Sequence, residues 1–303
     1  MNRRSAVIDL GTNTFHLLIA DPDPLLGFRE IHRVQSYTKL GFGGVNFIQE
    51  QYFKRGVSVL KEFKAEINRF GVREVRAFGT AVLRTASNGV EFAAEALQEA
   101  GIDINIIDGQ EEARLIYRGV SMACPVMEKE PNLIMDIGGG SVEFILSDTN
   151  GIRWAQSFPI GVAVLYRQFH HHEPILREEK EALYGYLEDM LQPLLRVLEK
   201  YPVRYLVGAA GAFDVVEGMI MGRWSTTPYV EVPLNQFPGI FQRVTQATLE
   251  ERLQIENLPS QRADLIVVGF LLIDFILRKV GISKMGVSHY SLKEGMLREM
   301  WGL

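Results

Sequence analysis

Residues 134–148 read IMDIGGGSVEFILSD. An apolar run reaches Asp136, passes through three adjacent glycines at 138–140, and resumes as a second apolar run. Three glycines in succession are entropically costly to order, so the pattern indicates a place where bare backbone is needed. The stretch predicts a strand, a tight turn and a second strand. The turn has two interpretations: it closes a hairpin and no more, or its backbone amides hold a phosphate group.

The same pattern occurs at residues 7–21, which read VIDLGTNTFHLLIAD. The two stretches align without a gap at an offset of 136 − 9 = 127 residues. The aligned pairs include Asp9 with Asp136, Gly11 with Gly138, Asp21 with Asp148, and His16 with Glu143. Two hairpins can resemble each other by chance, because they share a composition. The gapless alignment instead favours a duplicated architecture, with one hairpin in each half of the chain.

Composition and charge limit the classes of function. The chain has 303 residues, 47% hydrophobic and 23% charged, which is typical of a globular protein with room for two domains. Its formal net charge of −5 argues against nucleic-acid binding, which normally requires a basic face.

The expected compartment follows from other features of the same sequence. Cys124 is the only cysteine, so no intramolecular disulfide can form, and a reducing compartment fits. We see no signal peptide at the N-terminus. The apolar run 265–277 is interrupted by Asp274 and is short for a bilayer, which indicates a buried helix. We therefore expect a cytoplasmic protein with no membrane partner.

Strands and helices alternate along the chain, which predicts an α/β fold with a partly parallel sheet. Apolar residues at spacings of three and four predict an amphipathic helix over 50–70. Further helices are expected at about 88–100, from 110, and at 175–200, 234–256, 261–280 and from 292; further strands are expected at 74–78, 103–107, 151–158, 204–207 and 284–288. A polar, proline-flanked segment at 124–131 predicts two domains, 1–127 and 128–303, with helix 291–303 a candidate to join the first.

Each glycine turn could present several backbone N–H groups on one concave side, an arrangement that binds anions. Asp9 and Asp136 precede the turns at strand ends, where carboxylates can reach Mg²⁺ directly or through water. The alternative interpretation is that both aspartates only bond their own turns. The residues we expect to bind phosphate in the turns are Gly11, Thr12, Asn13, Gly138, Gly139, Gly140 and Ser141.

Several motifs resemble the exopolyphosphatase/guanosine pentaphosphate phosphohydrolase (Ppx/GppA) family of the actin, Hsp70 and sugar-kinase superfamily. They are VIDLGTNTFHLL, TAVLRTASN at 80–88, GQEEAR at 109–114 and DIGGGSVEF, with FPIG, VGAAG, RAD and KEG further along. The resemblance covers essentially the whole chain. It implies two actin-like (ribonuclease H-like) domains with an interdomain cleft.

The resemblance also implies roles for individual residues. Glu112 matches the proposed general base for the attacking water, and Arg84 matches a phosphate-binding arginine. Asp136 and Glu143 match an acidic pair that holds Mg²⁺ and positions water, with Asp9 as a further metal ligand. Without the resemblance, Glu112 would be read as part of a charged first helical turn and Arg84 as a surface arginine.

Two further features of the sequence need interpretation. Ala212 stands where the family commonly has a threonine, in a region that holds adenosine in related ATPases, which weakens any assignment of nucleotide handling. The segment HHHE at 170–173 could suggest a metal site, but adjacent histidines cannot all face one ion, and we expect a solvated loop.

The activity that we expect is Mg²⁺-dependent release of terminal phosphate from inorganic polyphosphate. The alternatives are the same chemistry on guanosine pentaphosphate, a small-molecule kinase of the same superfamily, a nucleotide-switched binding protein, and a catalytically silent phosphate sensor. A homodimer is one assembly to test.

Overall fold

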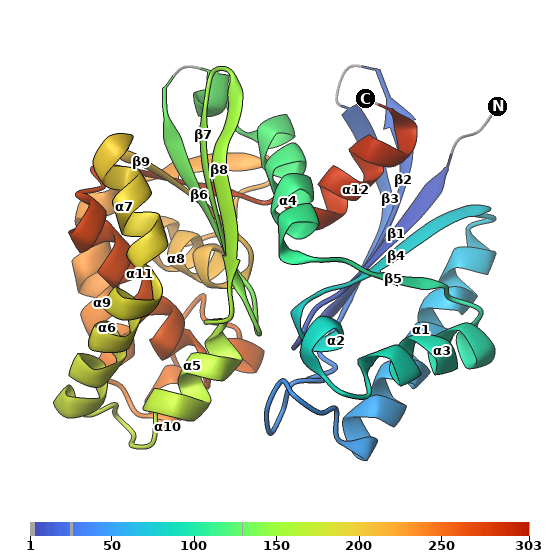
Figure 1. The fold of residues 1–303 in the computed structure, drawn as a ribbon, viewed down its shortest axis with the longest axis horizontal. Coiled ribbons are helices and arrows are strands. Elements are labelled where there is room, and N and C mark those ends of the chain that lie inside the picture. Colours follow the sequence, from blue (N-terminus) through green and yellow to red (C-terminus); the bar gives the residue numbers. More distant parts are fainter. Residues whose placement is uncertain (1–3, 25–26, 129, 303) are drawn as a thin grey trace. The chain divides into compact units, whose positions relative to one another are not determined.

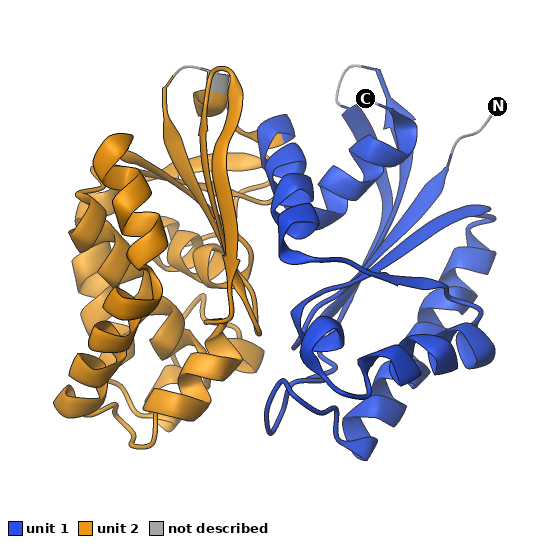
Figure 2. Cartoon of the chain, viewed as in Figure 1, with its two compact units in different colours: residues 1–122, 291–303 blue, residues 123–290 orange. Residues whose placement is uncertain are grey.

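The computed structural model describes residues 4–24, 27–128 and 130–302. Contacts divide the chain into unit 1, residues 1–122 with 291–303, and unit 2, residues 123–290 (Figure 2). The chain passes from unit 1 to unit 2 after residue 122, before the expected boundary at 127. The reason is that Pro125–Glu128 forms a short 3-10 helix that packs on a strand of unit 2. The second division exists because the C-terminal helix packs on unit 1, where Trp301 Nε1 donates to Ser5 Oγ at 3.0 Å.

Unit 1 is built on a five-stranded sheet in the order β3-β2-β1-β4-β5. The strands are β1 (Ser5–Leu10), β2 (Phe15–Asp23), β3 (Gly27–Ser36), β4 (Glu74–Gly79) and β5 (Ile104–Ile106). The helices are α1 (Glu50–Arg69), α2 (Ala81–Thr85), α3 (Gly89–Ala100), α4 (Gly109–Ala123) and α12 (Leu292–Trp301). Within this unit, α1 and α3 cover one face of the sheet, and α4 and α12 cover the other (Figure 1).

Unit 2 is built on a six-stranded sheet in the order β10-β11-β9-β6-β7-β8. The strands are β6 (Asn132–Ile137), β7 (Val142–Asp148), β8 (Gly151–Phe158), β9 (Tyr205–Ala209), β10 (Tyr229–Val232) and β11 (Lys284–Ser288). The helices are α5 (Val162–Phe169), α6 (Arg177–Met190), α7 (Gln192–Lys200), α8 (Gly211–Met221), α9 (Phe237–Thr245), α10 (Leu249–Arg252) and α11 (Ile266–Val280).

The sequence repeat is also a structural repeat. In unit 1 the antiparallel pair β1–β2 sets Asp9 opposite His16, and in unit 2 the pair β6–β7 sets Asp136 opposite Glu143. Each first strand then pairs in parallel on its other side, β1 with β4 and β6 with β9. Both units have three antiparallel strands followed by two parallel ones in the same order, and unit 2 adds the antiparallel edge strand β10. The chain is therefore an α/β protein of two actin-like (ribonuclease H-like) domains.

Most of the predicted elements are confirmed. They include the amphipathic helix α1, the strands β4 to β8 and β11, and the buried helix α11, in which every residue of the range 266–276 is buried. The prediction of one helical region at 234–256 was wrong in detail. Thr248 and Glu251 form a capping box that starts α10 separately from α9. Five elements were not predicted from the sequence: β3, α2, α5, α8 and β10.

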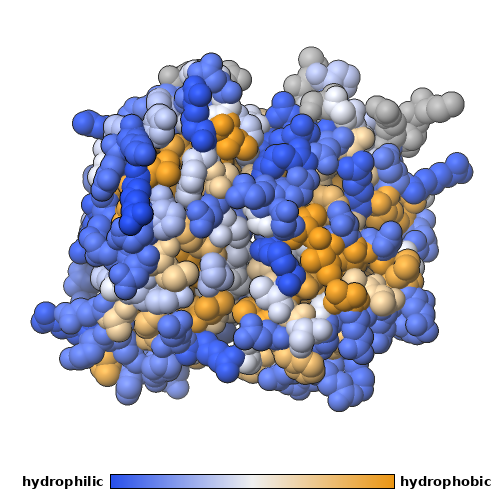
Figure 3. Space-filling view, in the orientation of Figure 1, coloured by the Kyte–Doolittle hydropathy of each residue, from blue (hydrophilic) through white to orange (hydrophobic). Residues whose placement is uncertain are grey.

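The surface and the helices also bear on the class of protein. None of the described helices is long and apolar enough to cross a membrane. On the face seen in Figure 3, hydrophilic residues cover most of the surface and apolar areas are smaller.

Candidate active site

The first glycine turn, Gly11 to Thr14, is tight and held from outside. The Gly11 amide donates to Thr14 O at 3.0 Å, which closes the turn. The carbonyls of Thr12 and Asn13 accept from the amides of Gly41 and Lys39, at 3.0 and 2.9 Å. Thr12 is 2% exposed, and its Oγ1 has no hydrogen-bond partner among the described residues. The turn is therefore rigid before any ligand arrives.

The second turn repeats this closure and adds a helix. The Gly138 amide donates to Ser141 O at 3.0 Å, and the carbonyls of Gly138 and Gly139 accept from the first amides of α5, at 3.0 and 2.9 Å. A Cβ added at Gly161 would lie 2.4 Å from the carbonyl carbon and oxygen of Gly139. The backbone at Gly161 thus packs directly on the backbone of the turn, which explains why position 161 needs a glycine.

The acidic pair of unit 2 lies beside this turn. Asp136 and Glu143 are opposite each other in register and are 7% and 1% exposed. Opposed residues of an antiparallel pair project from the same face of a sheet, where two like charges repel. Glu143 Oε1 accepts a hydrogen bond from Ser157 Oγ at 2.6 Å, and Ser157 faces it from β8. The sequence analysis missed Ser157, which only the β7–β8 register brings to the pair.

This pair is chemically suited to Mg²⁺. The ion is usually held by one or two carboxylates together with waters and phosphate oxygens. Among the described residues there is no cluster of three or more His, Cys, Asp or Glu side chains that could hold a metal ion. Asp136 and Glu143 could hold such an ion, and a cation would neutralise their mutual repulsion. Asp9 lies in unit 1 opposite His16, and its part in metal binding stays a prediction.

Arg84 and Glu112 form an ion pair at one edge of the unit 1 sheet. Arg84 Nη1 donates to Glu112 Oε2 at 3.1 Å and to Ile107 O at 2.7 Å. Glu112 is 6% exposed although it belongs to the first turn of α4. Its neighbour Glu111 pairs instead with Arg114, whose hydrogen bonds lower the pKa of the Glu111 carboxyl. The two adjacent glutamates therefore have different surroundings, and only Glu112 is buried.

The predicted residues of unit 1 collect at the carboxyl ends of its parallel strands. Thr80 Oγ1 donates to Leu10 O at 3.4 Å, and Ile107 N donates to Gly79 O at 3.0 Å. These bonds tie together the ends of β1, β4 and β5, from which the first turn, α2 and α4 depart. Ligands of α/β proteins bind outside the carboxyl ends of such strands.

The predicted residues fall into two sets, one in each unit. Unit 1 holds Asp9, Gly11, Thr12, Asn13, Arg84 and Glu112; unit 2 holds Asp136, Gly138, Gly139, Gly140, Ser141 and Glu143. That the two sets face one cleft stays a prediction.

The expected solvated loop at 170–173 is wrong for His170. This histidine is 5% exposed, and burial lowers the pKa of its ring. The reason is tertiary: Glu173 accepts two hydrogen bonds from Arg252, at 2.8 and 2.7 Å, and Arg252 is completely buried. This ion pair fixes the segment on α10. His172 remains exposed and pairs with Glu179 at 2.8 Å.

Known proteins match both the sequence and the fold. The family model of the Ppx/GppA phosphatases matches residues 18–302. The match begins after the first glycine turn, Gly11 to Thr14. The chain is 36% identical to an exopolyphosphatase from Cytophaga hutchinsonii, with a TM-score of 0.94 over 99% of this chain and 98% of that one. It is 26% identical to the PPX-GPPA enzyme of Aquifex aeolicus, with a TM-score of 0.80 over 99% and 100% of the two chains. The chain belongs to the Ppx/GppA phosphatase family.

Proposed function

We propose that this phosphatase is a Mg²⁺-dependent exopolyphosphatase, which releases terminal phosphate from inorganic polyphosphate by hydrolysis. The proposal rests on the repeated hairpin, whose two copies differ in the residue opposite the aspartate. Both copies have the glycine turn and the aspartate, but a glutamate stands opposite the aspartate only in unit 2. Two phosphate-binding turns suit a substrate with a row of phosphates, and the unequal position suits a single catalytic metal.

The roles of the side chains follow from their surroundings. Glu112 is buried and lies within hydrogen-bond distance of Arg84, and a carboxylate in this place could accept a proton from the attacking water. In the proposed step a water oxygen bonds to the terminal phosphorus and Glu112 takes a proton of the water. The bond from that phosphorus to the bridging oxygen breaks, and the shortened polyphosphate leaves with the bridging oxygen and its electron pair. Arg84 and the amides of the two turns would contact phosphate oxygens. A Mg²⁺ ion held by Asp136 and Glu143 would supply positive charge against the phosphate oxygens.

The test is phosphate release from three substrates, with and without Mg²⁺. The substrates are long-chain polyphosphate, guanosine pentaphosphate and ATP. We expect polyphosphate to be hydrolysed fastest, and only with Mg²⁺. Faster release from guanosine pentaphosphate would reassign the substrate while keeping the chemistry. Phosphoryl transfer that requires an added alcohol acceptor would support a kinase instead, and no turnover of any substrate would support a sensor.

A further inference from the structure

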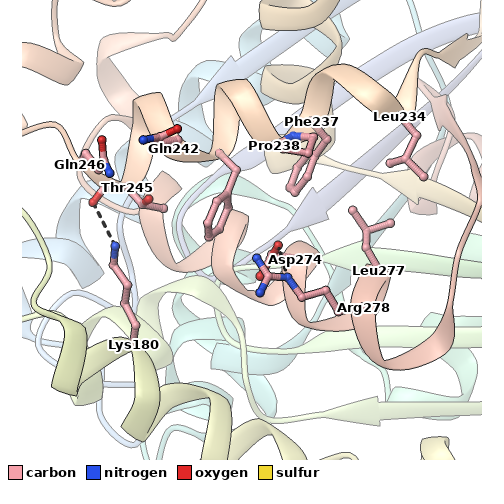
Figure 4. A pocket seen from close by; sticks show the side chains of 11 residues that line it. Lys180, Leu234, Phe237, Pro238, Gln242, Thr245, Gln246, Asp274, Leu277 and Arg278 are labelled. Carbon is pink, nitrogen blue, oxygen red and sulfur yellow. Dashed lines mark hydrogen bonds and ion pairs between the residues drawn. The ribbon is translucent and has the colours of Figure 1, made fainter.

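Unit 2 contains a cavity of about 500 Å³ that involves none of the candidate active-site residues. It lies among α6, α9 and α11 (Figure 4). Its lining combines three charged residues with apolar ones, and those that matter here are Lys180, Asp274, Arg278, Phe237, Phe241 and Leu277. The volume is in the range of small-molecule pockets, about 300–1,000 Å³.

The apolar side of the cavity is aromatic and firmly packed. The rings of Phe237 and Phe241 lie 6.0 Å apart between centroids, and Phe237 also stacks on Phe270 at 5.8 Å. Phe237 is only 2% exposed, so the packing of α9 on α11 holds it in place. The half-buried ring of Phe241, backed by Phe237, offers contact to a flat or extended apolar group.

The acidic group in the lining is already satisfied. Asp274 Oδ2 accepts from the hydroxyl of Tyr184 at 2.6 Å, and Asp274 Oδ1 accepts from Arg278 Nε at 2.9 Å. The charges of Asp274 and Arg278 therefore offset each other, and the carboxylate attracts a cationic ligand only weakly.

Because Asp274 pairs with Arg278, the charge of the Lys180 ammonium is the one in the lining that is not offset. Its side chain reaches from α6 toward α9, where Nζ donates to Thr245 O at 3.5 Å (Figure 4). No carboxylate lies within ion-pair distance of this ammonium in the described part of the chain. Burial lowers the pKa of Lys180, as it does for a cation that loses water without gaining a counter-ion. An anion placed here would gain a charge-assisted hydrogen bond.

We propose that this cavity binds a small organic anion with an apolar body, of the monocarboxylate class. The carboxylate would bond Lys180, and the apolar chain would lie against Phe237, Phe241 and Leu277. The inference is independent of the proposed polyphosphate chemistry, since every residue that carries it lies outside the candidate active site.

Three ligands of equal chain length test the charge preference: octanoate, octanol and octylamine, titrated by calorimetry into the full chain. We expect octanoate to bind about tenfold more tightly than octanol, because only the carboxylate can form the ionic hydrogen bond. Octylamine should bind more weakly than octanol. Equal affinities for octanoate and octanol in the parental protein would overturn the proposal.

Variants locate the binding within the cavity. Lys180→Met should abolish the preference for octanoate over octanol, while Lys180→Arg should retain it. Phe241→Ala should weaken the binding of both octanoate and octanol. The matched control is Lys279→Met, because Lys279 lies on α11 outside the cavity and pairs with Glu188 at 2.7 Å. Undiminished octanoate binding by Lys180→Met, with circular dichroism showing an intact fold, would place the binding elsewhere and refute the assignment.

Discussion

Asp136 on β6 lies directly opposite Glu143 on β7, in the same register that sets Asp9 opposite His16 in the other unit. A duplicated hairpin has thus kept the aspartate and changed its partner. An aspartate–histidine pair can be neutral or a favourable ion pair, whereas two buried carboxylates are repulsive without a cation. The equivalent positions of the two units therefore differ in the number of carboxylates: one in unit 1 and two in unit 2.

The first prediction concerns this pair. Glu143→Gln keeps the size of the side chain and removes its charge, so we expect a fall in kcat/KM of about a hundredfold and a requirement for more Mg²⁺. Asp148→Asn is the control, because Asp148 ends the same strand but pairs with Arg153 near the surface. A Mg²⁺ titration of phosphate release measures both. An unchanged Mg²⁺ dependence in Glu143→Gln would remove Glu143 from the metal site.

Two adjacent glutamates offer a matched test of the general base. Glu112→Gln should lower kcat by about 10²–10⁴, the usual contribution of general base catalysis, with polyphosphate binding nearly unchanged. Glu111→Gln should have little effect on kcat, because Glu111 pairs with Arg114 rather than with Arg84. Single-turnover kinetics and a binding titration separate the two steps. Hydrolysis at the parental rate by Glu112→Gln would assign the base elsewhere.

The contact between the second turn and α5 can be tested at Gly161. Gly161→Ala would place a Cβ 2.5 Å from the carbonyl carbon of Gly140, so the turn must shift. We expect a loss of about 1–3 kcal/mol in the free energy of unfolding, together with most of the activity. Gly185→Ala is the control: Gly185 lies on the exposed face of α6, an added Cβ meets nothing within 4 Å, and the change should raise the free energy of unfolding by about 0.5–1 kcal/mol. Urea unfolding measures both values, and full activity in Gly161→Ala would contradict the proposed role of the second turn.

Much of the fold follows from local sequence, and the elements missed have physical reasons. The two glycine hairpins and helix α1 have strongly periodic apolar residues, and the structure confirms all three. Helix α8 contains two glycines and several β-branched residues, which are weak helix formers, and its burial in the core stabilises it instead. Strand β3 alternates poorly because it is the polar edge strand, held by its pairing with β2.

The sequence identified the residues of the candidate site, but it did not show which of them contact each other. The sequence identifies the glycine turns and the two glutamates, yet it cannot show that Arg84 bonds Glu112, which lies 28 residues away. Nor can it show that α5 packs on the second turn. Such contacts depend on how strands are ordered in the sheet, which is a property of the whole domain.

A partly buried ion pair in unit 2 predicts a pH dependence of stability. Glu217 is completely buried, and its Oε2 lies 2.6 Å from His289 Nε2, an interaction that raises the pKa of His289 above 6.5. Because the folded state binds the proton more tightly, this stabilisation is fully present below about pH 6.5 and is lost as pH rises through the folded pKa.

The variant His289→Gln should therefore lose about 2 kcal/mol of unfolding free energy at about pH 6, and much less at about pH 9. Urea unfolding of both proteins at the two pH values checks this. His172→Gln is the control, because His172 forms its ion pair with Glu179 at the exposed surface. A loss for His289→Gln that is equal at both pH values would show that the pair acts through packing rather than charge.

The thiol of Cys124 should be nearly inert in the folded protein. Cys124 is 2% exposed, and burial raises the pKa of its thiol to about 12. Alkylation requires the thiolate, whose fraction at about pH 8 would be only about one in ten thousand at such a pKa. Mass spectrometry after iodoacetamide treatment should find little label on the native protein and complete label in denaturant. Rapid labelling of the native protein would mean that the segment where the two units join opens on the timescale of the reaction, because only exposure would restore the ordinary thiol pKa.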